Sequence, residues 1–238
     1  MDSEKSFIAL IEQSIKKNWN ADALTDYKGA TLQFKDVARK IEKIHIILEE
    51  SGVKKGDKIA ICGRNSSNWG VTFLAVVTYG AVIVPILHEF KPDQVHNIVN
   101  HSEAKLLFVG DMVWENLDES AMQNLEGIIL INDFSILVSR SEKLTYAREN
   151  LNALFGQKYP KNFRKEHISY YKYSPEEMLV LNYTSGTTSF SKGVMLPSKA
   201  MWSNIVFGQE KLGKCLKAGD SVVSMLPMAH MYGLAFEF

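Results

Sequence analysis

Cysteine is scarce in this sequence. Cys62 and Cys215 are the only two among 238 residues, they lie far apart, and no Cys-x-x-Cys pair occurs. A disulfide framework is therefore disfavoured, and two reduced thiols in a cytoplasmic protein are expected. Histidine does not suggest a structural zinc site either, because His96 and His101 are five residues apart and do not share a helix face.

The sequence also has no excess of charge and no long hydrophobic run. Lys plus Arg and Asp plus Glu number 27 each, so nucleic acid is not an expected partner and any phosphate site must be local. No apolar stretch approaches the length of a membrane span, and Glu12 interrupts the N-terminal one, so no secretory signal is indicated. With 46% hydrophobic residues, the chain has the composition of a globular protein with one large domain or two modest ones.

Helix-like and strand-like hydrophobic patterns alternate along the first part of the chain. Helices are predicted at Phe34–Leu48 with Gly52 beyond its end, from Ser66 or Ser67 through Tyr79 with Gly80 closing it, at Pro92–Asn100, and from Val113 to about Leu125. Strands are predicted at Lys58–Cys62, Val82–Val84, Leu106–Val109 and Ile128–Ile131. This order predicts an α/β fold, a doubly wound and mainly parallel sheet with helices on both faces.

A second unit is predicted to begin at Pro175, after a less regular region with a helix at Tyr146–Phe155. Its elements are expected at Met178–Leu181 (strand), Val194–Leu196 (strand), Ser198 to about Leu212 (helix) and Ser221–Leu226 (strand). The domain prediction is therefore 1–174 for an N-terminal α/β subdomain and 175–238 for the start of a second α/β subdomain.

A segment rich in hydroxyl groups connects the first two of these strands. It holds Thr184, Ser185, Gly186, Thr187, Thr188, Ser189, Lys192 and Gly193. Backbone N–H groups, hydroxyls and one ammonium are the donors that a triphosphate requires, and the glycines allow close approach of the backbone. Read alone, the same composition also fits a solvated turn.

This segment is not a Walker loop. A Walker loop needs Gly-Lys followed by Ser or Thr at the start of a helix, whereas Ser191 precedes Lys192 here and Gly193 follows it. An NTP-hydrolysing P-loop protein is therefore disfavoured.

The segment instead resembles the signature loop of the adenylate-forming enzymes, the superfamily of acyl-CoA synthetases, peptide-synthetase adenylation domains and luciferases. Their pattern is aromatic-Thr-Ser-Gly-Thr-Thr-Gly-x-Pro-Lys-Gly-Val, and nine positions between Tyr183 and Val194 agree with it. Ser189 and Ser191 stand where glycine and proline are usual. The stretches 52–61, 65–69 and 226–233 also resemble the family, in the same order, and the wording Leu-Pro-Met-Ala-His favours its long-chain fatty acyl-CoA synthetases.

The resemblance implies two stacked sheets with the ligand between them and an ATP-dependent fatty acid–CoA ligase that uses Mg²⁺ and coenzyme A. It places ATP on residues 184–189, Lys192 and Gly193, and it assigns catalytic positions to Lys192 and His230, the latter near the acyl pocket. Without the resemblance, His230 fits an ordinary loop histidine and Lys192 a solvated lysine. Peripheral membrane association through the acyl substrate is a further expectation.

The later motifs of the family are absent after Phe238, so the chain is expected to be an incomplete and inactive fragment. The apolar residues at its end, Leu234 to Phe238, are expected to leave a surface that associates. Two alternatives stay open at this point: an adenylate-forming ligase that activates aryl or amino acids, and a non-catalytic binding module.

Overall fold

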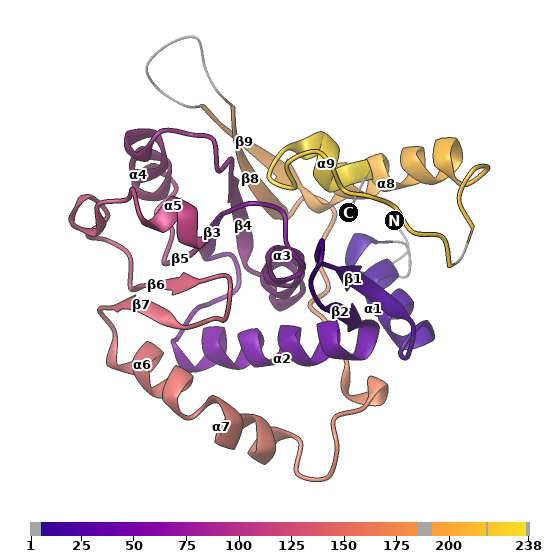
Figure 1. Ribbon diagram of the computed structural model, residues 1–238, viewed down its shortest axis with the longest axis horizontal. Helices are drawn as coiled ribbons and strands as arrows, with labels where there is room; N and C mark the ends of the chain where they lie inside the picture. Colours follow the sequence, from indigo (N-terminus) through magenta and orange to yellow (C-terminus); the bar gives the residue numbers. More distant parts are fainter. Residues whose placement is uncertain (1–5, 185–191, 218, 237–238) are drawn as a thin grey trace.

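A seven-stranded mixed sheet forms the centre of the protein (Figure 1), in the strand order β7-β6-β5-β3-β4-β8-β9. The computed structural model describes the backbone of residues 6–184, 192–217 and 219–236, and side chains through Leu234. The strands are β3 (Lys58–Cys62), β4 (Val82–Ile86), β5 (Leu106–Val109), β6 (Gly127–Leu130), β7 (Ile136–Ser139), β8 (Met178–Thr184) and β9 (Lys192–Pro197). Pairing is parallel from β6 to β8 and antiparallel for the two outer strands, β7 and β9.

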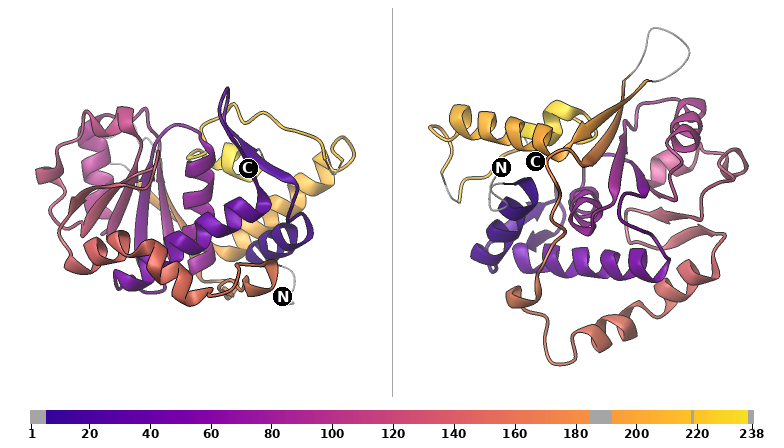
Figure 2. Two further views of the ribbon diagram at one scale, coloured as in Figure 1. Left: turned by 60° about the horizontal axis from the view of Figure 1, so that its bottom comes forward. Right: turned by 180° about the vertical axis from the view of Figure 1, so that it is seen from behind.

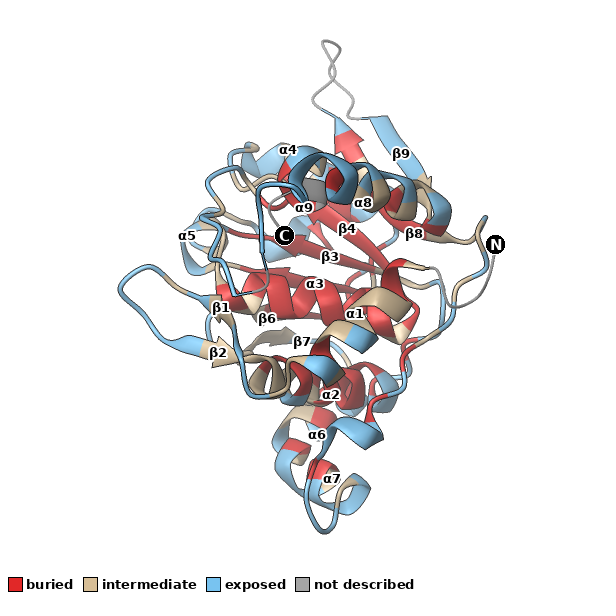
Figure 3. Ribbon diagram, turned by 90° about the vertical axis from the view of Figure 1, so that its right-hand side faces the viewer, coloured by how far each residue is buried: buried red, intermediate tan, exposed pale blue. Residues whose placement is uncertain are grey.

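Helices cover both faces of this sheet (Figure 2), as predicted for a doubly wound α/β fold. One face carries α1 (Phe7–Lys17), α2 (Phe34–Glu50) and α3 (Ser67–Tyr79), and the odd-numbered residues Ile59 and Ile61 of β3 are buried on this side. The other face is covered by α4 (Pro92–His101), and the even-numbered residues Ala60 and Cys62 are buried there. Because both faces are buried, β4, β5 and β3 after Lys58 are continuous apolar runs. Figure 3 shows β3, β4 and α3 as the buried centre.

The remaining elements lie around this centre. They are the hairpin β1 (Asp22–Thr25) and β2 (Thr31–Gln33), α5 (Asp111–Trp114), η1 (Glu119–Ala121), α6 (Glu142–Glu149), α7 (Leu151–Lys158), η2 (Lys165–His167), α8 (Ser198–Leu212) and α9 (Met231–Phe236). No helix in the described ranges is long and apolar enough to cross a membrane.

The ends of α3 confirm the predicted capping residues. The Ser66 hydroxyl accepts a hydrogen bond from the Trp69 amide at 3.1 Å, which satisfies a free N–H of the first turn. Gly80 ends the helix with φ +96°, a left-handed conformation that favours glycine. The helix therefore begins and ends where its sequence predicts, which places its N-terminus at the carboxyl end of β3.

Three local predictions were wrong. A helix from Val113 to Leu125 does not form, because the Asp118 carboxylate accepts from the Ser120 amide and starts the short η1 instead. The helix predicted at Tyr146–Phe155 is divided between α6 and α7 at Asn150, whose side chain donates to the Tyr146 carbonyl. Residues 221–226 form no strand, because no neighbouring strand pairs with them within the described residues.

The two strands predicted for a second unit join the first sheet. β8 pairs with β4 in parallel, with Val180 opposite Ile83, and β9 returns antiparallel to β8. The expected second stacked sheet is therefore not formed by these strands, whose backbone groups complete the sheet begun by β3 to β6. The division at residue 174 into two subdomains stays a prediction.

Exposed apolar side chains concentrate in the last part of the chain. Ten of the thirteen exposed large apolar residues in the described part lie between Val194 and Tyr232, with Met195 71% and Met225 81% exposed. The predicted association would depend on these side chains more than on Leu234, which is buried. Association itself stays a prediction.

Tyrosines fasten the connection between α7 and β8 to the first part of the chain. The Tyr159 hydroxyl donates to the buried Glu42 carboxylate at 2.6 Å. The Tyr171 amide donates to the Thr78 carbonyl at 2.9 Å. The Tyr173 hydroxyl lies 2.9 Å from the Val77 carbonyl oxygen and 3.1 Å from that of Ala81, at the end of α3. The chain thus reaches β8 along a defined path.

Two glycines allow a matched test of this path. Gly80 and Gly56 both have positive φ, but a Cβ on Gly80 would lie 2.7 Å from Tyr171 Cγ, whereas one on Gly56 meets nothing within 4 Å. Gly56→Ala is expected to lower the free energy of unfolding by about 1–2 kcal/mol through backbone strain alone. Gly80→Ala is expected to lower it by a further amount of about 1–3 kcal/mol through overpacking, measured by urea unfolding. Equal losses for the two variants would contradict the contact with Tyr171.

The two thiols differ in burial, which predicts a pH dependence. Cys62, the last residue of β3, is fully buried, and this burial raises the pKa of its thiol to about 12, whereas Cys215 is exposed. The unfolded chain loses the Cys62 proton above pH about 8.5. The native state retains that proton, so the free energy of unfolding falls as pH rises from there toward the raised pKa.

Urea unfolding at two pH values checks this sign. The stability advantage of wild type over Cys62→Ala is expected to shrink by about 1–2 kcal/mol between pH 8.5 and pH 10. Cys215→Ala is the control and should show no such change. A constant difference between wild type and Cys62→Ala over this range would show that the buried thiol does not have the raised pKa.

Candidate functional site

The predicted phosphate loop begins and ends in two paired strands. Thr184, the last residue of β8, lies opposite Lys192, the first residue of β9, and Tyr183 lies opposite Gly193. The strands are longer than predicted, so Thr184, Lys192 and Gly193 belong to the hairpin itself. Thr184 and Lys192 are both exposed. Ser185, Gly186, Thr187, Thr188 and Ser189 lie outside the described residues.

The strand register places this hairpin mouth at the carboxyl edge of the parallel sheet. Cys62, Ile86, Val109 and Leu130 end β3 to β6 in line with one another. Val180 is opposite Ile83, three residues before the end of β4, and Tyr183 is three residues after Val180. Thr184 therefore emerges one residue beyond the level at which the other parallel strands end, where α/β folds collect their ligand-binding loops.

His101 of α4 contacts the hairpin through Tyr183 of β8. Its Nδ1 lies 2.7 Å from the Tyr183 hydroxyl, and the two rings meet edge to face. Burial raises the pKa of Tyr183, so its phenol stays protonated. A Cβ on Gly193 would lie 3.1 Å from Tyr183 Cζ, so glycine suits the position opposite this ring. From the sequence, His101 was a candidate only as a metal ligand. Its contact with Tyr183 joins residues 82 positions apart, so no local pattern signals it.

His230 lies in a different segment, at the start of α9. Its amide donates to the Pro227 carbonyl at 2.9 Å, and its Nδ1 accepts from the Tyr232 amide at 3.2 Å. A neutral imidazole in this arrangement carries its proton on Nε2. A Cβ on Gly233 would lie 2.7 Å from the Pro227 carbonyl oxygen, so the turn requires glycine there. The described contacts do not join His230 to Thr184, Lys192 or Gly193.

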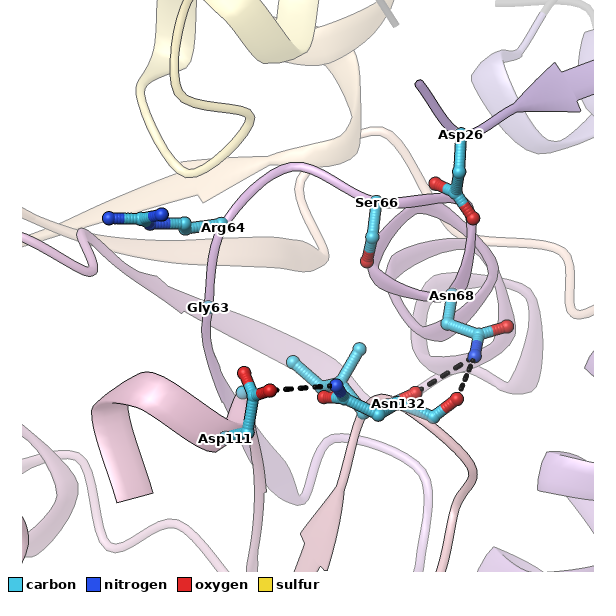
Figure 4. A pocket seen from close by; sticks show the side chains of 9 residues that line it. Asp26, Gly63, Arg64, Ser66, Asn68, Asp111 and Asn132 are labelled. Atoms are coloured by element: carbon cyan, nitrogen blue, oxygen red, sulfur yellow. Dashed lines mark hydrogen bonds between the residues drawn. The ribbon is translucent and has the colours of Figure 1, made fainter. Parts of the chain in front are cut away.

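A polar cavity of about 240 Å³ opens beside the ends of β3, β5 and β6 (Figure 4). It lies between strands whose following helices go to opposite faces of the sheet, the place where doubly wound folds bind ligands. Its lining includes Asp26, Asp111 and Asn132, and Asn132 Nδ2 donates to Asp111 at 3.2 Å. Figure 4 shows the Arg64 side chain pointing away from Asp26 and Asn68. Arg64 nevertheless lines the same cavity, which therefore holds two carboxylates and one guanidinium.

The described residues offer no metal centre. No group of three or more His, Cys, Asp or Glu side chains in that part of the chain could hold an ion. His96 accepts a hydrogen bond from the Asp118 amide, and His101 contacts Tyr183, so the two histidines serve separate structural contacts.

Comparison with known proteins places this arrangement in a family. The family described as AMP-binding enzyme matches residues 11–238. The chain belongs to the AMP-binding enzyme family, and the resemblance to adenylate-forming enzymes is confirmed.

Among curated relatives, "Long chain acyl-CoA synthetase 3" of Arabidopsis thaliana is 26% identical over 208 residues, which are 86% of this chain and 31% of that protein. "Long-chain-fatty-acid--CoA ligase" of Escherichia coli O157:H7 is 24% identical over 261 residues, which are 99% of this chain and 44% of that protein. The chain therefore spans less than half the length of these relatives.

Solved structures agree on the fold. A long-chain-fatty-acid-CoA ligase from Archaeoglobus fulgidus has a TM-score of 0.74 at 22% identity, covering 97% of this chain and 44% of that one. A red emitting luciferase from Phrixothrix hirtus has a TM-score of 0.79 at 17% identity, covering 97% and 43%. The predicted α/β fold, that of the N-terminal domain of the adenylate-forming superfamily, is confirmed.

A double-mutant cycle tests the support of the hairpin by His101. His101→Ala and Tyr183→Phe each remove one side of the same hydrogen bond, so their effects on the free energy of unfolding are expected to be coupled by about 0.5–1.5 kcal/mol. His96→Ala, on the same helix, is the control, and its effect should add to that of Tyr183→Phe within about 0.5 kcal/mol. Additive effects in both cycles would mean that the His101–Tyr183 contact contributes nothing measurable.

Proposed function

We propose that this chain carries the phosphate-binding loop and part of the acyl pocket of a ligase that activates a fatty acid with ATP and passes the acyl group to coenzyme A. The observation that supports it most is the pairing of Thr184 with Lys192 at the mouth of the β8–β9 hairpin. A hydroxyl and an ammonium thereby flank both ends of a connection whose sequence is Ser-Gly-Thr-Thr-Ser-Phe-Ser.

The position of this mouth suits a polyphosphate. It lies at the carboxyl edge of the sheet, as the register of β8 against β4 requires. In the proposal Thr184 and residues 185–189 donate hydroxyl and backbone N–H groups to phosphate oxygens, Gly193 lets the backbone approach, and Lys192 adds a positive charge. The roles of residues 185–189 rest on the sequence alone.

The proposed first step forms an acyl adenylate. A carboxylate oxygen of the substrate forms a bond to the α-phosphorus of ATP, the bond from that phosphorus to the bridging oxygen breaks, and pyrophosphate leaves with the electron pair. Negative charge therefore grows on the leaving group, beside Lys192. A fixed ammonium stabilises such charge without having to reorient during the reaction.

The proposed second step transfers the acyl group. The sulfur of coenzyme A attacks the acyl carbonyl carbon, the bond from that carbon to the adenylate oxygen breaks, and AMP leaves while the thiol proton passes to a base. His230 is proposed to line the acyl pocket, where the Tyr232 amide fixes its ring through Nδ1. Because Nδ1 is engaged by the Tyr232 amide, Nε2 is the ring nitrogen that can face the acyl group.

The choice of a long-chain fatty acid rests on the names of the curated relatives, which are 24% to 27% identical to this chain. A panel of fatty, aryl and amino acids in a pyrophosphate-release assay distinguishes this substrate class from the others in the superfamily. Magnesium is expected to accompany ATP, but the described residues do not form a carboxylate site that fits the ion, so no step is assigned to it. A cytoplasmic location and peripheral membrane contact through the acyl chain are part of the proposal.

Lys192→Ala tests the loop in a protein that contains this chain and has the length of its curated relatives, here called the complete enzyme. Loss of the ammonium is expected to raise the barrier to adenylate formation by about 2–4 kcal/mol. That corresponds to a rate of pyrophosphate release lower by roughly 30- to 900-fold. Coenzyme A acylation from preformed acyl adenylate should change far less, because pyrophosphate is absent from that step.

Lys199→Ala is the matched control, because Lys199 is an exposed lysine seven residues away that pairs with Glu176. It should leave pyrophosphate release unchanged. The isolated 238-residue chain is expected to bind ATP weakly and to release no pyrophosphate, as titration calorimetry and the same assay can show. Equal rates for wild type and Lys192→Ala, or turnover by the isolated chain, would contradict these assignments.

A further inference from the structure

The segment that carries His230 has little regular structure to hold it. Between α8 and α9 the chain forms no helix or strand in its described residues, and Val223 and Met225 are 76% and 81% exposed. Met228 and Ala229 nevertheless are buried in the core beside α3. Some contact must therefore fix where this segment meets the sheet.

Asn65 makes that contact with both ends of its carboxamide. Its Nδ2 donates to the Leu226 carbonyl at 2.7 Å and to Ser224 Oγ at 3.2 Å, and its Oδ1 accepts from the Met228 amide at 2.8 Å. The Leu226 carbonyl can only accept and the Met228 amide can only donate. The assignment of oxygen and nitrogen is therefore fixed by the partners, and one side chain satisfies backbone groups on both sides of Pro227.

The position of Asn65 itself is well determined. It follows β3 by three residues, next to Ser66, the N-cap of α3. Gly63, just before it, packs so closely on Gly110 that a Cβ there would lie 3.3 Å from the Gly110 nitrogen. The carboxamide thus projects from the junction of a buried strand and a buried helix.

We propose that Asn65 is a positioning residue that sets the place of His230 relative to the carboxyl end of β3. Met228, which Asn65 holds, is two residues before His230, and the His230 amide returns to Pro227 within the same turn. Among the described residues, the β3–α3 junction holds the turn that carries His230, and no contact joins His230 to β8 or β9. The acyl side and the phosphate side of the site are then positioned by different parts of the sheet. The link to acyl binding rests on the function proposed above.

Hydrogen exchange on the 238-residue chain tests the contact without any activity. Asn65→Ala should speed exchange of the amides in residues 224–230, that of Met228 above all, by about tenfold or more. The Met228 amide loses its acceptor, and the rest of the segment loses the side chain that holds the Leu226 carbonyl and the Ser224 hydroxyl. Exchange in α2 and β4 should stay as in wild type, which shows that the variant is folded. Asn65→Asp keeps the acceptor for Met228 but loses the donor for Leu226, and should give a smaller increase.

Asn100→Ala is the control for this experiment. Asn100 lies in α4, on the other face of the sheet, and its Nδ2 donates to the Ala121 carbonyl at 2.8 Å. Loss of this contact should leave the exchange rates of residues 224–230 unchanged. Exchange in Asn65→Ala within about twofold of wild type would overturn the proposal, since the contact would then contribute nothing to local stability.

Kinetics of the complete enzyme test the positioning role. Asn65→Ala should raise the KM for the fatty acid by about tenfold while the KM for ATP changes little, because only the His230 side is released. Equal increases in both KM values would overturn the positioning role. Wild type without carboxylate-dependent pyrophosphate release would overturn the proposed function, whereas the exchange experiment would still decide whether Asn65 holds the segment.

Discussion

The parallel pairing of β8 with β4 determines where the candidate site can form. It joins a hairpin from late in the chain to a sheet whose order was established by β3 to β6. Once Val180 is opposite Ile83, the constant rise per residue of the two strands places Thr184 at the carboxyl edge of the sheet. A shift by one residue would also turn Leu181 and Tyr183 away from the α4 face, where they are buried, so core packing opposes such a shift.

Because the sheet is buried on both faces, the polar side chains near it are found at the carboxyl ends of its strands. The buried residues of β3 and β5 are all apolar, and polar residues follow just beyond the carboxyl ends of these strands, at Arg64, Asn65 and Asp111. Three features stand at this edge. The hairpin mouth offers Lys192, the loop after β3 contacts the His230 segment through Asn65, and residues of the same loop line the polar cavity near Asp111.

Elements with strong local signals were predictable from sequence. Helices α2 and α3 formed as predicted, because each signal depends only on nearby residues. These signals are the apolar periodicity of α2, the capping serine before α3 and the glycine after it. The failures involve competition or distant partners. Asp118 binds its own backbone where a helix was expected, and residues 221–226 have strand-like composition without a strand to pair with.

The same distinction applies to the candidate site. The hydroxyl-rich segment was recognisable from its composition and spacing, whereas the strands beside it extend to Thr184 and Lys192, further than predicted. The contacts of His101 with Tyr183 and of Asn65 with Met228 join residues 82 and 163 positions apart. Such pairs follow from the sheet order, which a single sequence does not specify.

The tyrosines along the connection to β8 bear on how the sheet is completed. The entropy lost in closing a loop grows with its length, and β8 begins 92 residues after β4 ends. Tyr171 and Tyr173 bind the end of α3, whose next strand is β4 itself. When these two residues are docked, the loop left to close before β8 meets β4 is only a few residues long. The two tyrosines therefore divide the closure of one long loop into two shorter closures. Strand β8 then pairs with β4 while the residues just before it are already fixed at the end of α3.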